Sequence, residues 1–321
     1  MLLPLLLVGC SRKAEPQPSL PQGGQQSPAE QATALMERAF EHRKAHRWSD
    51  ALADYQAAKQ LAPDDPDVHR GVKLFERLGK FLAEIRELDA RMAFAPDDVQ
   101  TLGDRALLFL RSDDAELALS DSIEAGAKAP WAVRPKLFQA LALIALGRAE
   151  QCEALRVDRR IHLNALTPEF LETISRLDGE ISVEQTNPDL YTARAWQLNE
   201  IGQPRLALAD TESALQNDPN SAGAHAERSY ALTKLGRADE ALEEIKRATE
   251  LDENFATGWQ YRGELEVARG DLNAAVESLS RALTISPNIS ALQKREHAYR
   301  ELGETAKADD DLHALEALSA R

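Results

Sequence analysis

The sequence has few cysteines, few bases relative to acids and no long apolar run, and each shortage excludes a class of protein. Two cysteines, Cys10 and Cys152, in 321 residues are too few for a disulfide framework. The 53 acids outnumber the 38 bases and give a formal net charge of −15. Such a surface repels phosphate backbones, so nucleic acid is not expected as a partner. Beyond Cys10, no apolar run approaches the roughly 20 residues that a membrane-spanning helix needs.

The residues that are abundant favour an all-α fold. Ala, Leu, Glu and Arg dominate, and the alternation of Val, Ile and Thr that is typical of strands is hardly present. Acids and bases are interleaved along the chain, as on a solvated helical surface. Apolar residues make up 43% of the chain, which is enough for the core of one large domain or of two ordinary ones.

The stretch PLLLVGCSRK, residues 4–13, places Cys10 directly after a short apolar run. Residues 1–9 resemble the signal peptide of bacterial lipoproteins, in which the cysteine becomes the first mature residue and is acylated. In that family a serine after the cysteine, here Ser11, implies the outer membrane. Because no Lys or Arg precedes the run, two alternatives stay open: a start codon placed too far downstream, and a cytosolic scaffold with a chance leucine cluster.

The residues after Cys10 have the composition of a spacer. Residues 11–30 contain four prolines, two glycines and no apolar periodicity, so we expect a lipidated cysteine and a disordered linker over 10–30. Each buried CH₂ contributes about 0.8 kcal/mol, so two or three acyl chains hold a protein firmly at a membrane. The signal peptide, Cys10 and the linker together predict a lipid-anchored protein of the bacterial cell envelope, at the outer membrane and facing the periplasm.

From residue 31 onward the sequence repeats itself. Four glycines lie 34, 34 and 33 residues apart, and an alanine follows each of them five residues later. Earlier in the chain the same frame continues less regularly. The glycines are Gly202, Gly236, Gly270 and Gly303, the alanines are Ala207, Ala241, Ala275 and Ala308, and the earlier equivalents of the glycines are His46, Gly79, Asp113 and Gly147.

This pattern resembles the tetratricopeptide repeat (TPR), whose unit is a helix-turn-helix hairpin of 34 residues. The glycine suits a left-handed residue that ends the first helix, and the small residues let the two helices approach closely. The resemblance implies an all-α TPR solenoid of about eight repeats. We expect an N-terminal lobe of four repeats, two of them degenerate, over 31–164, an odd joining helix over 165–187, and a C-terminal lobe of four repeats over 188–321.

The odd helix follows from the spacing. Gly147 and Gly202 are 55 residues apart, which is 21 more than one repeat, and the surplus opens with a helix start at Thr167. We expect such a helix to break the register of the solenoid and to separate two lobes. Cys152 stands where a small residue belongs, so it is interpreted as a core residue in place of alanine.

An arginine recurs at the seventh position of six repeats, and an acid follows sixteen residues later in five of them. Both positions lie about 12 Å from the turn on antiparallel helices, so we expect an ion pair within each repeat rather than an anion-binding site. The arginines are Arg38, Arg105, Arg194, Arg228, Arg262 and Arg295, and the residues sixteen later are Asp54, Asp121, Asp210, Glu244, Ser278 and Asp311.

The resemblance to TPR proteins also implies a concave groove lined by the first helices, which would bind an extended segment or a helix of a partner protein. Rings there would take apolar side chains, and amides would pair with peptide groups. The alternative is that Trp196 and Tyr230 only pack between neighbouring repeats. The groove residues are Trp196, Asn199, Tyr230, Gln260, Tyr261, Gln293, His297 and Arg300.

In the N-terminal lobe the equivalent positions form an apolar surface. Such a surface is too apolar to face water, so either the odd helix or a second chain or partner helix must cover it. The residues are Leu107, Leu110, Leu137, Leu141 and Ile144.

No pattern of catalytic residues is found. His42 and His46 lie four residues apart, as in some metal sites, but no cysteine or carboxylate accompanies them, so we expect neither a metal nor a cofactor. We therefore predict a non-catalytic scaffold for protein–protein interactions, tethered to the envelope through Cys10. The alternatives are a homo-oligomeric structural protein and a cytosolic TPR scaffold.

Overall fold

The computed structural model describes residues 26–319, which form sixteen α-helices and two short 3₁₀ helices and contain no strand. The expected all-α fold is confirmed for these residues, whereas Cys10 and the predicted signal peptide over 1–9 lie outside them. The α-helices are α1 (Pro28–Lys44), α2 (Trp48–Leu61), α3 (Pro66–Gly79), α4 (Leu82–Phe94), α5 (Val99–Arg111), α6 (Ala115–Lys128), α7 (Arg134–Ala145), α8 (Pro168–Val183), α9 (Pro188–Glu200), α10 (Pro204–Asn217), α11 (Ala222–Lys234), α12 (Ala238–Leu251), α13 (Ala256–Arg269), α14 (Leu272–Ile285), α15 (Ile289–Glu301) and α16 (Thr305–Ser319).

The hairpins turn at the predicted positions, because the residue that ends the first helix adopts a left-handed conformation. Its φ is 76° at Gly236 and 82° at Gly270, where glycine meets no steric penalty. His46 and Asp113 adopt the same conformation, with φ of 56° and 63°, although a Cβ makes it less favourable. Gly79 is the exception, since it ends α3 without a positive φ.

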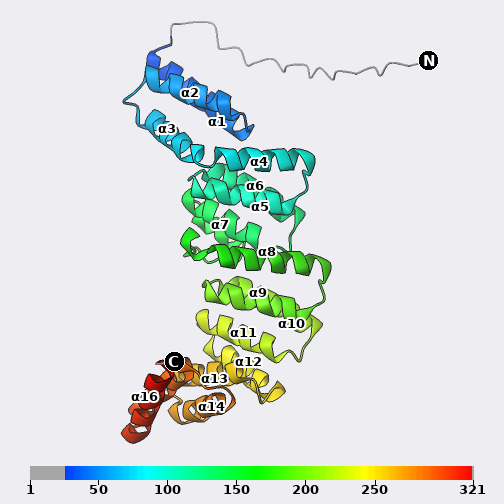
Figure 1. Cartoon of the computed structure of the whole chain (residues 1–321), viewed down its shortest axis with the longest axis vertical. Coiled ribbons are helices and arrows are strands. Elements are labelled where there is room, and N and C mark those ends of the chain that lie inside the picture. Colours follow the sequence, from blue (N-terminus) through cyan, green and yellow to red (C-terminus); the bar gives the residue numbers. More distant parts are fainter. Residues whose placement is uncertain (1–25, 320–321) are drawn as a thin grey trace, which may run out of the picture. The chain divides into compact units, whose positions relative to one another are not determined.

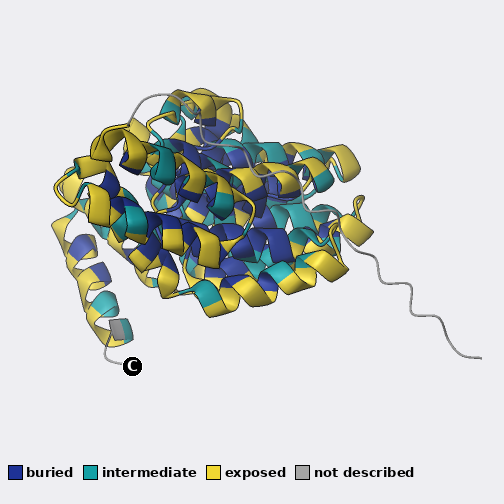
Figure 2. Cartoon of the chain, turned by 90° about the horizontal axis from the view of Figure 1, so that it is seen from above, coloured by how far each residue is buried: buried dark blue, intermediate teal, exposed yellow. Residues whose placement is uncertain are grey.

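The predicted small residues form the tightest part of the core. The alanines that follow the glycines by five residues are fully buried, and Figure 2 shows buried residues on the faces where helices meet. Gly263 of α13 shows how closely paired helices approach, since a Cβ there would lie 2.5 Å from the Cγ atom of Leu279 on α14. A larger residue in such a place costs about 1–3 kcal/mol of overpacking.

The described residues fall into two compact units, one that ends at Lys73 and one that begins at Leu74. In the first unit, α1, α2 and the start of α3 share a core of Ala32, Ala58 and Val68. In the second, the pairs α5–α6, α9–α10, α11–α12, α13–α14 and α15–α16 form hairpins that follow one another (Figure 1). The lobe boundaries expected from the sequence stay a prediction.

The fourth hairpin departs from the repeat. After α7 the chain forms only the 3₁₀ helices η1 (Ala149–Glu153) and η2 (Leu163–Ala165) before α8 begins. Cys152 keeps the predicted small position: its buried Sγ donates to the carbonyl oxygen of Ala140 at 3.7 Å. Burial raises the pKa of this thiol, as expected of an unreactive core residue. At Arg156 φ is 58°, and the chain does not continue as a helix.

The helix α8 supplies the second helix that this hairpin lacks. Asp178 on α8 lies sixteen residues before Arg194, as Asp89 on α4 lies sixteen before Arg105, and each carboxylate accepts a hydrogen bond from Nη1 of its arginine. The sequence predicted an odd helix that breaks the register of the solenoid. In the structure, α8 takes the place of a second helix instead. The surplus residues are an insertion ahead of a regular second helix. Its predicted apolar residues are buried: Phe170, Leu171, Ile174, Leu177 and Ile181.

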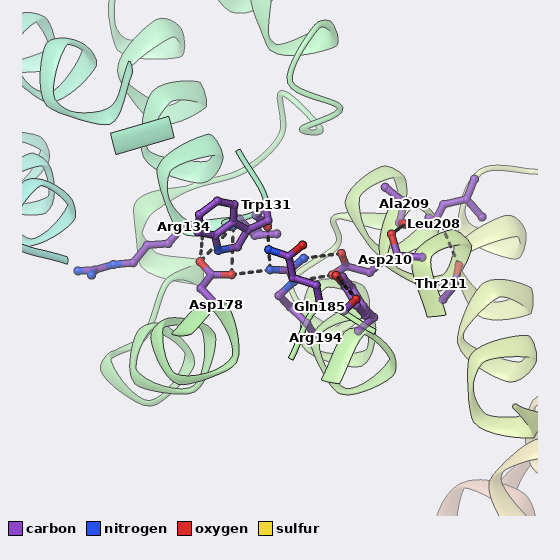
Figure 3. A network of polar contacts seen from close by, with 12 residues as sticks. Trp131, Arg134, Asp178, Gln185, Arg194, Leu208, Ala209, Asp210 and Thr211 are labelled. Carbon is purple, nitrogen blue, oxygen red and sulfur yellow. Dashed lines mark hydrogen bonds and ion pairs between the residues drawn. The ribbon is translucent and has the colours of Figure 1, made fainter. Parts of the chain in front are cut away.

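Figure 3 shows how Asp178 joins α8 to its neighbours. The carboxylate accepts the backbone N–H groups of Val133 and Arg134 at the start of α7, at 3.1 and 3.2 Å, and binds Nη1 of Arg194 at 2.6 Å. Arg194 also donates to both carboxylate oxygens of Asp210, at 2.7 and 2.8 Å. Each charge in this network thus has partners of opposite charge or backbone donors, which is what burial requires.

Candidate functional site

The arginine column belongs to the fold. Arg38, Arg105, Arg194 and Arg295 each donate two hydrogen bonds to the carboxylate sixteen residues later, so the predicted pairs are confirmed there. Arg228 and Glu244 are 3.5 Å apart.

Arg262 differs from the other arginines of the column. It pairs with Glu266 at 2.9 Å because Ser278, sixteen residues after it, carries no charge. Ser278 donates to the same Glu266 carboxylate at 2.7 Å. Five of the six arginines thus donate hydrogen bonds to carboxylates, as expected of structural pairs, whereas Nε of Arg228 has no hydrogen-bond partner among the described residues.

The predicted groove residues of the C-terminal repeats differ in accessibility. The side chain of Trp196 is 46% exposed, whereas that of Asn199, one helical turn later on α9, is 4% exposed. Arg300 forms ion pairs with Glu296 and Asp309. The half-buried members are Tyr230, Gln260 and Tyr261, and the exposed ones are Gln293, His297 and Arg300.

Asn199 is held by a residue that the sequence analysis missed, Glu227 on α11. Nδ2 of Asn199 donates to the backbone oxygen of Glu227 at 3.1 Å and to Oε2 of the same residue at 2.8 Å. Asn199 therefore links α9 to α11 instead of pointing freely toward a partner. Its Oδ1 atom is buried and has no hydrogen-bond partner among the described residues.

Glu227 is a buried acid without a cation. Its side chain is 7% exposed, and within residues 26–319 it forms no ion pair with a Lys, Arg or His. Burial raises the pKa of Glu227 to about 7; the Asn199 hydrogen bond opposes this rise and the nearby Glu200 charge adds to it. The carboxyl group is thus poised to gain or lose a proton near neutral pH.

Two tyrosine rings lie beside this acid. The ring centroids of Tyr230 on α11 and Tyr261 on α13 are 5.2 Å apart. Burial raises the pKa of Tyr261, and the charges of Glu227 and Glu200 raise it further, so the phenol stays neutral. We call Asn199, Glu227, Tyr230 and Tyr261 the acidic–aromatic site.

The repeat position of Glu227 does not single it out in the sequence. Glu227 holds the sixth position of its repeat, directly before the arginine, where the neighbouring C-terminal repeats carry Ala193 and Tyr261. Other repeats carry Glu37, Asp104 and Lys294 there, so an acid at this position does not by itself mark an unusual environment.

The apolar positions of the N-terminal lobe are not an open surface. Leu107, Leu110, Leu137 and Leu141 are buried within the chain, and Ile144 is half-buried. The helices α5 and α7, which carry them, pack against each other, and α8 packs on α7. Packing within the chain therefore covers these residues, and no second chain is needed to do so.

The histidine pair has structural contacts. His42 lies 3.5 Å from Asp54, and the His46 ring packs on Trp48 at 5.2 Å between centroids. Within residues 26–319 no group of three or more His, Cys, Asp or Glu side chains is placed to hold a metal ion. In the same range, no helix combines the length and apolarity required to span a bilayer.

Comparison with known proteins gives a family match within the C-terminal repeats. The family model described as tetratricopeptide repeat matches residues 222–255, which comprise α11 and α12. No curated protein matches the chain.

Solved structures align with the chain only loosely. MamA aligns over 45% of this chain and 86% of its own, with 21% identity and a TM-score of 0.40. PilF of Pseudomonas aeruginosa aligns over 68% and 91%, with 12% identity and a TM-score of 0.39. A tetratricopeptide repeat protein of Parabacteroides merdae aligns over 84% and 98%, with 15% identity and a TM-score of 0.35.

The hairpins on both sides of the matched repeat share its turn position and its buried alanines. The left-handed glycine recurs at Gly202, Gly270 and Gly303, and the alanine five residues later is fully buried in each case. Residues 222–255 thus match the tetratricopeptide repeat, and the hairpins on both sides of them share its geometry.

Proposed function

We propose that this protein is a non-catalytic scaffold that binds a segment of a partner protein along α9, α11 and α13. The observation that carries the proposal is the exposure of Trp196, which is 46% exposed in repeats that bury most of their other large apolar residues. Tyr230 and Tyr261 lie half-buried on the next two first helices, and Gln260 offers an amide. Aromatic rings beside amide groups suit an extended peptide, because rings take apolar side chains and amides pair with the peptide backbone.

A crosslinking pull-down with the full chain tests this binding face. The double variant Trp196→Ala/Tyr230→Ala should lose the partners that the wild type recovers, because it removes the exposed rings. Phe94→Ala is the matched control, since the Phe94 ring is 92% exposed at the end of α4 and lies on none of α9, α11 and α13. Recovery of the same partners by the double variant would contradict the proposal.

We also propose that an acylated Cys10 tethers the scaffold to the outer membrane, with the repeats facing the periplasm. The support is the sequence alone: a short apolar run before Cys10, Ser11 after it, and a proline-rich linker to residue 30. Labelling of cells with a clickable fatty acid tests the tether. Incorporation that disappears in Cys10→Ala supports it, and incorporation that is absent or unchanged in the variant contradicts it.

A further inference from the structure

The arginines on the helices of the acidic–aromatic site are engaged with acids outside it, and the one lysine nearby contacts a ring of the site and not Glu227. Arg194 and Arg228 pair with acids on second helices, and Arg262 pairs with Glu266. Lys234 lies over the ring of Tyr230, with Nζ 4.9 Å from the centroid. Arg269, at the end of α13, pairs with Asp239 and Asp271. None of these groups neutralises Glu227.

The acids nearby add to the negative potential of the site. Glu200 of α9 and Glu264 of α13 are close enough to Tyr261 for their charges to raise its pKa, together with Glu227. Glu264 accepts hydrogen bonds from Gln260 and Ser290, both at 2.9 Å, and neither donor carries a charge. Carboxylates from three neighbouring first helices thus act on the Tyr261 ring, and no cation is bound to Glu227.

We propose that the acidic–aromatic site receives an arginine side chain of the partner segment. The inference rests on the proposed function, since it names the residue of that segment which this face selects. The guanidinium would donate to the Glu227 carboxylate and lie against the Tyr230 and Tyr261 rings. The charge complementarity follows from the acids on α9, α11 and α13, and the unpartnered Oδ1 atom of Asn199 offers a further acceptor beside Glu227.

Arginine fits this site better than lysine for two physical reasons. Its planar guanidinium presents several donors in a fixed fork, which can serve a carboxylate and a neighbouring amide oxygen together. It also stacks on aromatic rings and is more weakly hydrated than an ammonium group, so it is transferred more readily to a site where Glu227 is only 7% exposed.

Selection from a random linear peptide library displayed on phage, with the full chain as bait, tests the inference. Binding of the selected sequences is then measured by fluorescence anisotropy with synthetic peptides that carry arginine, lysine or citrulline at the enriched position. Citrulline has nearly the shape of arginine but no charge. We expect arginine to be enriched, and its replacement by citrulline to weaken binding about tenfold or more.

The variants show whether Glu227 is responsible. In Glu227→Gln the preference for arginine over citrulline should fall to near unity, whereas in Glu277→Gln it should be unchanged, because Glu277 is exposed on the second helix α14. Thermal unfolding of Glu227→Gln verifies that the fold is kept.

The outcomes separate this inference from the proposed function. Peptides that need Trp196 and Tyr230 but contain no arginine would overturn the inference and leave the proposed function standing. The same holds if the arginine preference survives in Glu227→Gln. If every selected peptide binds Trp196→Ala/Tyr230→Ala as well as the wild type, or if none binds the chain, both fail.

Discussion

The helix α9 takes part in two buried polar clusters whose charges are balanced differently. Arg194, 2% exposed, lies between Asp178 and Asp210, and backbone N–H groups share the charge of Asp178. Five residues later, Asn199 lies against Glu227, an acid with no cation. Burial disfavours the charge of Arg194, but the two aspartates more than offset it and raise the pKa of the guanidinium.

The two clusters show how a buried charge that stabilises the fold differs from one that is available for binding. A buried charge that is neutralised inside the chain stabilises a particular packing of helices, and its removal damages that packing. A buried charge with only one amide donor costs free energy in the free protein, and that cost is reduced when the group binds a proton or a cation.

The largest effect is expected from Arg194→Ala. The substitution leaves the carboxylates of Asp178 and Asp210 buried without their cation, so the free energy of unfolding should fall by about 3–5 kcal/mol. Chemical denaturation at neutral pH measures it. The loss should become smaller as the pH falls, because the unpaired carboxylates then take up protons.

The matched control for that experiment is Arg228→Ala. Arg228 holds the same repeat position on α11, but its contact with Glu244 is 3.5 Å long and its side chain is 32% exposed. A loss in Arg194→Ala no larger than that in Arg228→Ala would show that the network around α8 does not stabilise the fold as proposed.

Glu227→Gln should change the stability less than Arg194→Ala does, and it should stabilise the protein instead of destabilising it. The pKa of Glu227 is raised from 4.5 to about 7, so the folded state holds a proton that the unfolded state has released between these values. Wild-type stability therefore falls as the pH rises from about 4.5 to about 7, by up to about 3 kcal/mol. The glutamine side chain of the variant does not titrate, so the variant should be more stable than the wild type at pH 8 and lose that advantage near pH 4.

Thermal unfolding across this pH range measures the difference between the two proteins. The charge of Glu200 on α9 acts on Glu227, that of Glu264 on α13 acts on the neighbouring Tyr261, and Lys234 lies on the same helix as Glu227. Glu277→Gln on α14 serves as the control and should show no such pH-dependent difference. A constant difference between Glu227→Gln and the wild type would mean that Glu227 is already ionised at low pH.

The repeat frame was predictable because backbone conformation and close packing restrict the residue type. The turns at Gly202, Gly236 and Gly270 and the buried alanines follow from steric rules that each repeat must obey separately. The pairing of Arg38 with Asp54 was predictable for the same reason, since two positions in one hairpin have fixed geometry.

The features that the sequence did not reveal depend on neighbouring repeats. That α8 acts as a second helix is visible only once Asp178 is seen to bind Arg194. The Asn199–Glu227 contact joins residues 28 apart on two first helices, and no rule within one repeat specifies it. Likewise, the burial of Leu107 and Leu141 depends on how adjacent hairpins pack.

A modest effect on stability is expected from exchanging the two residues of the partly exposed pair Arg228–Glu244. Arg228→Glu should destabilise the protein by about 0.2–1 kcal/mol, because the pair is partly solvated, and Glu244→Arg by more, because it also removes the 2.6 Å contact of Glu244 with His225. The double exchange Arg228→Glu/Glu244→Arg should recover part of that loss. Urea denaturation of the four proteins forms a double-mutant cycle, and a coupling free energy of zero would mean that the 3.5 Å contact contributes nothing.

The smallest effect on stability is expected from Trp196→Ala. A ring that is 46% exposed contributes little to the core, so the free energy of unfolding should change by no more than about 0.5 kcal/mol. The same substitution should nevertheless weaken binding of the peptides selected by the full chain, because the exposed ring is part of the proposed binding face. Denaturation and anisotropy on the same preparations measure both quantities. A large loss of stability would assign Trp196 to packing between repeats, which is the alternative that its sequence position left open.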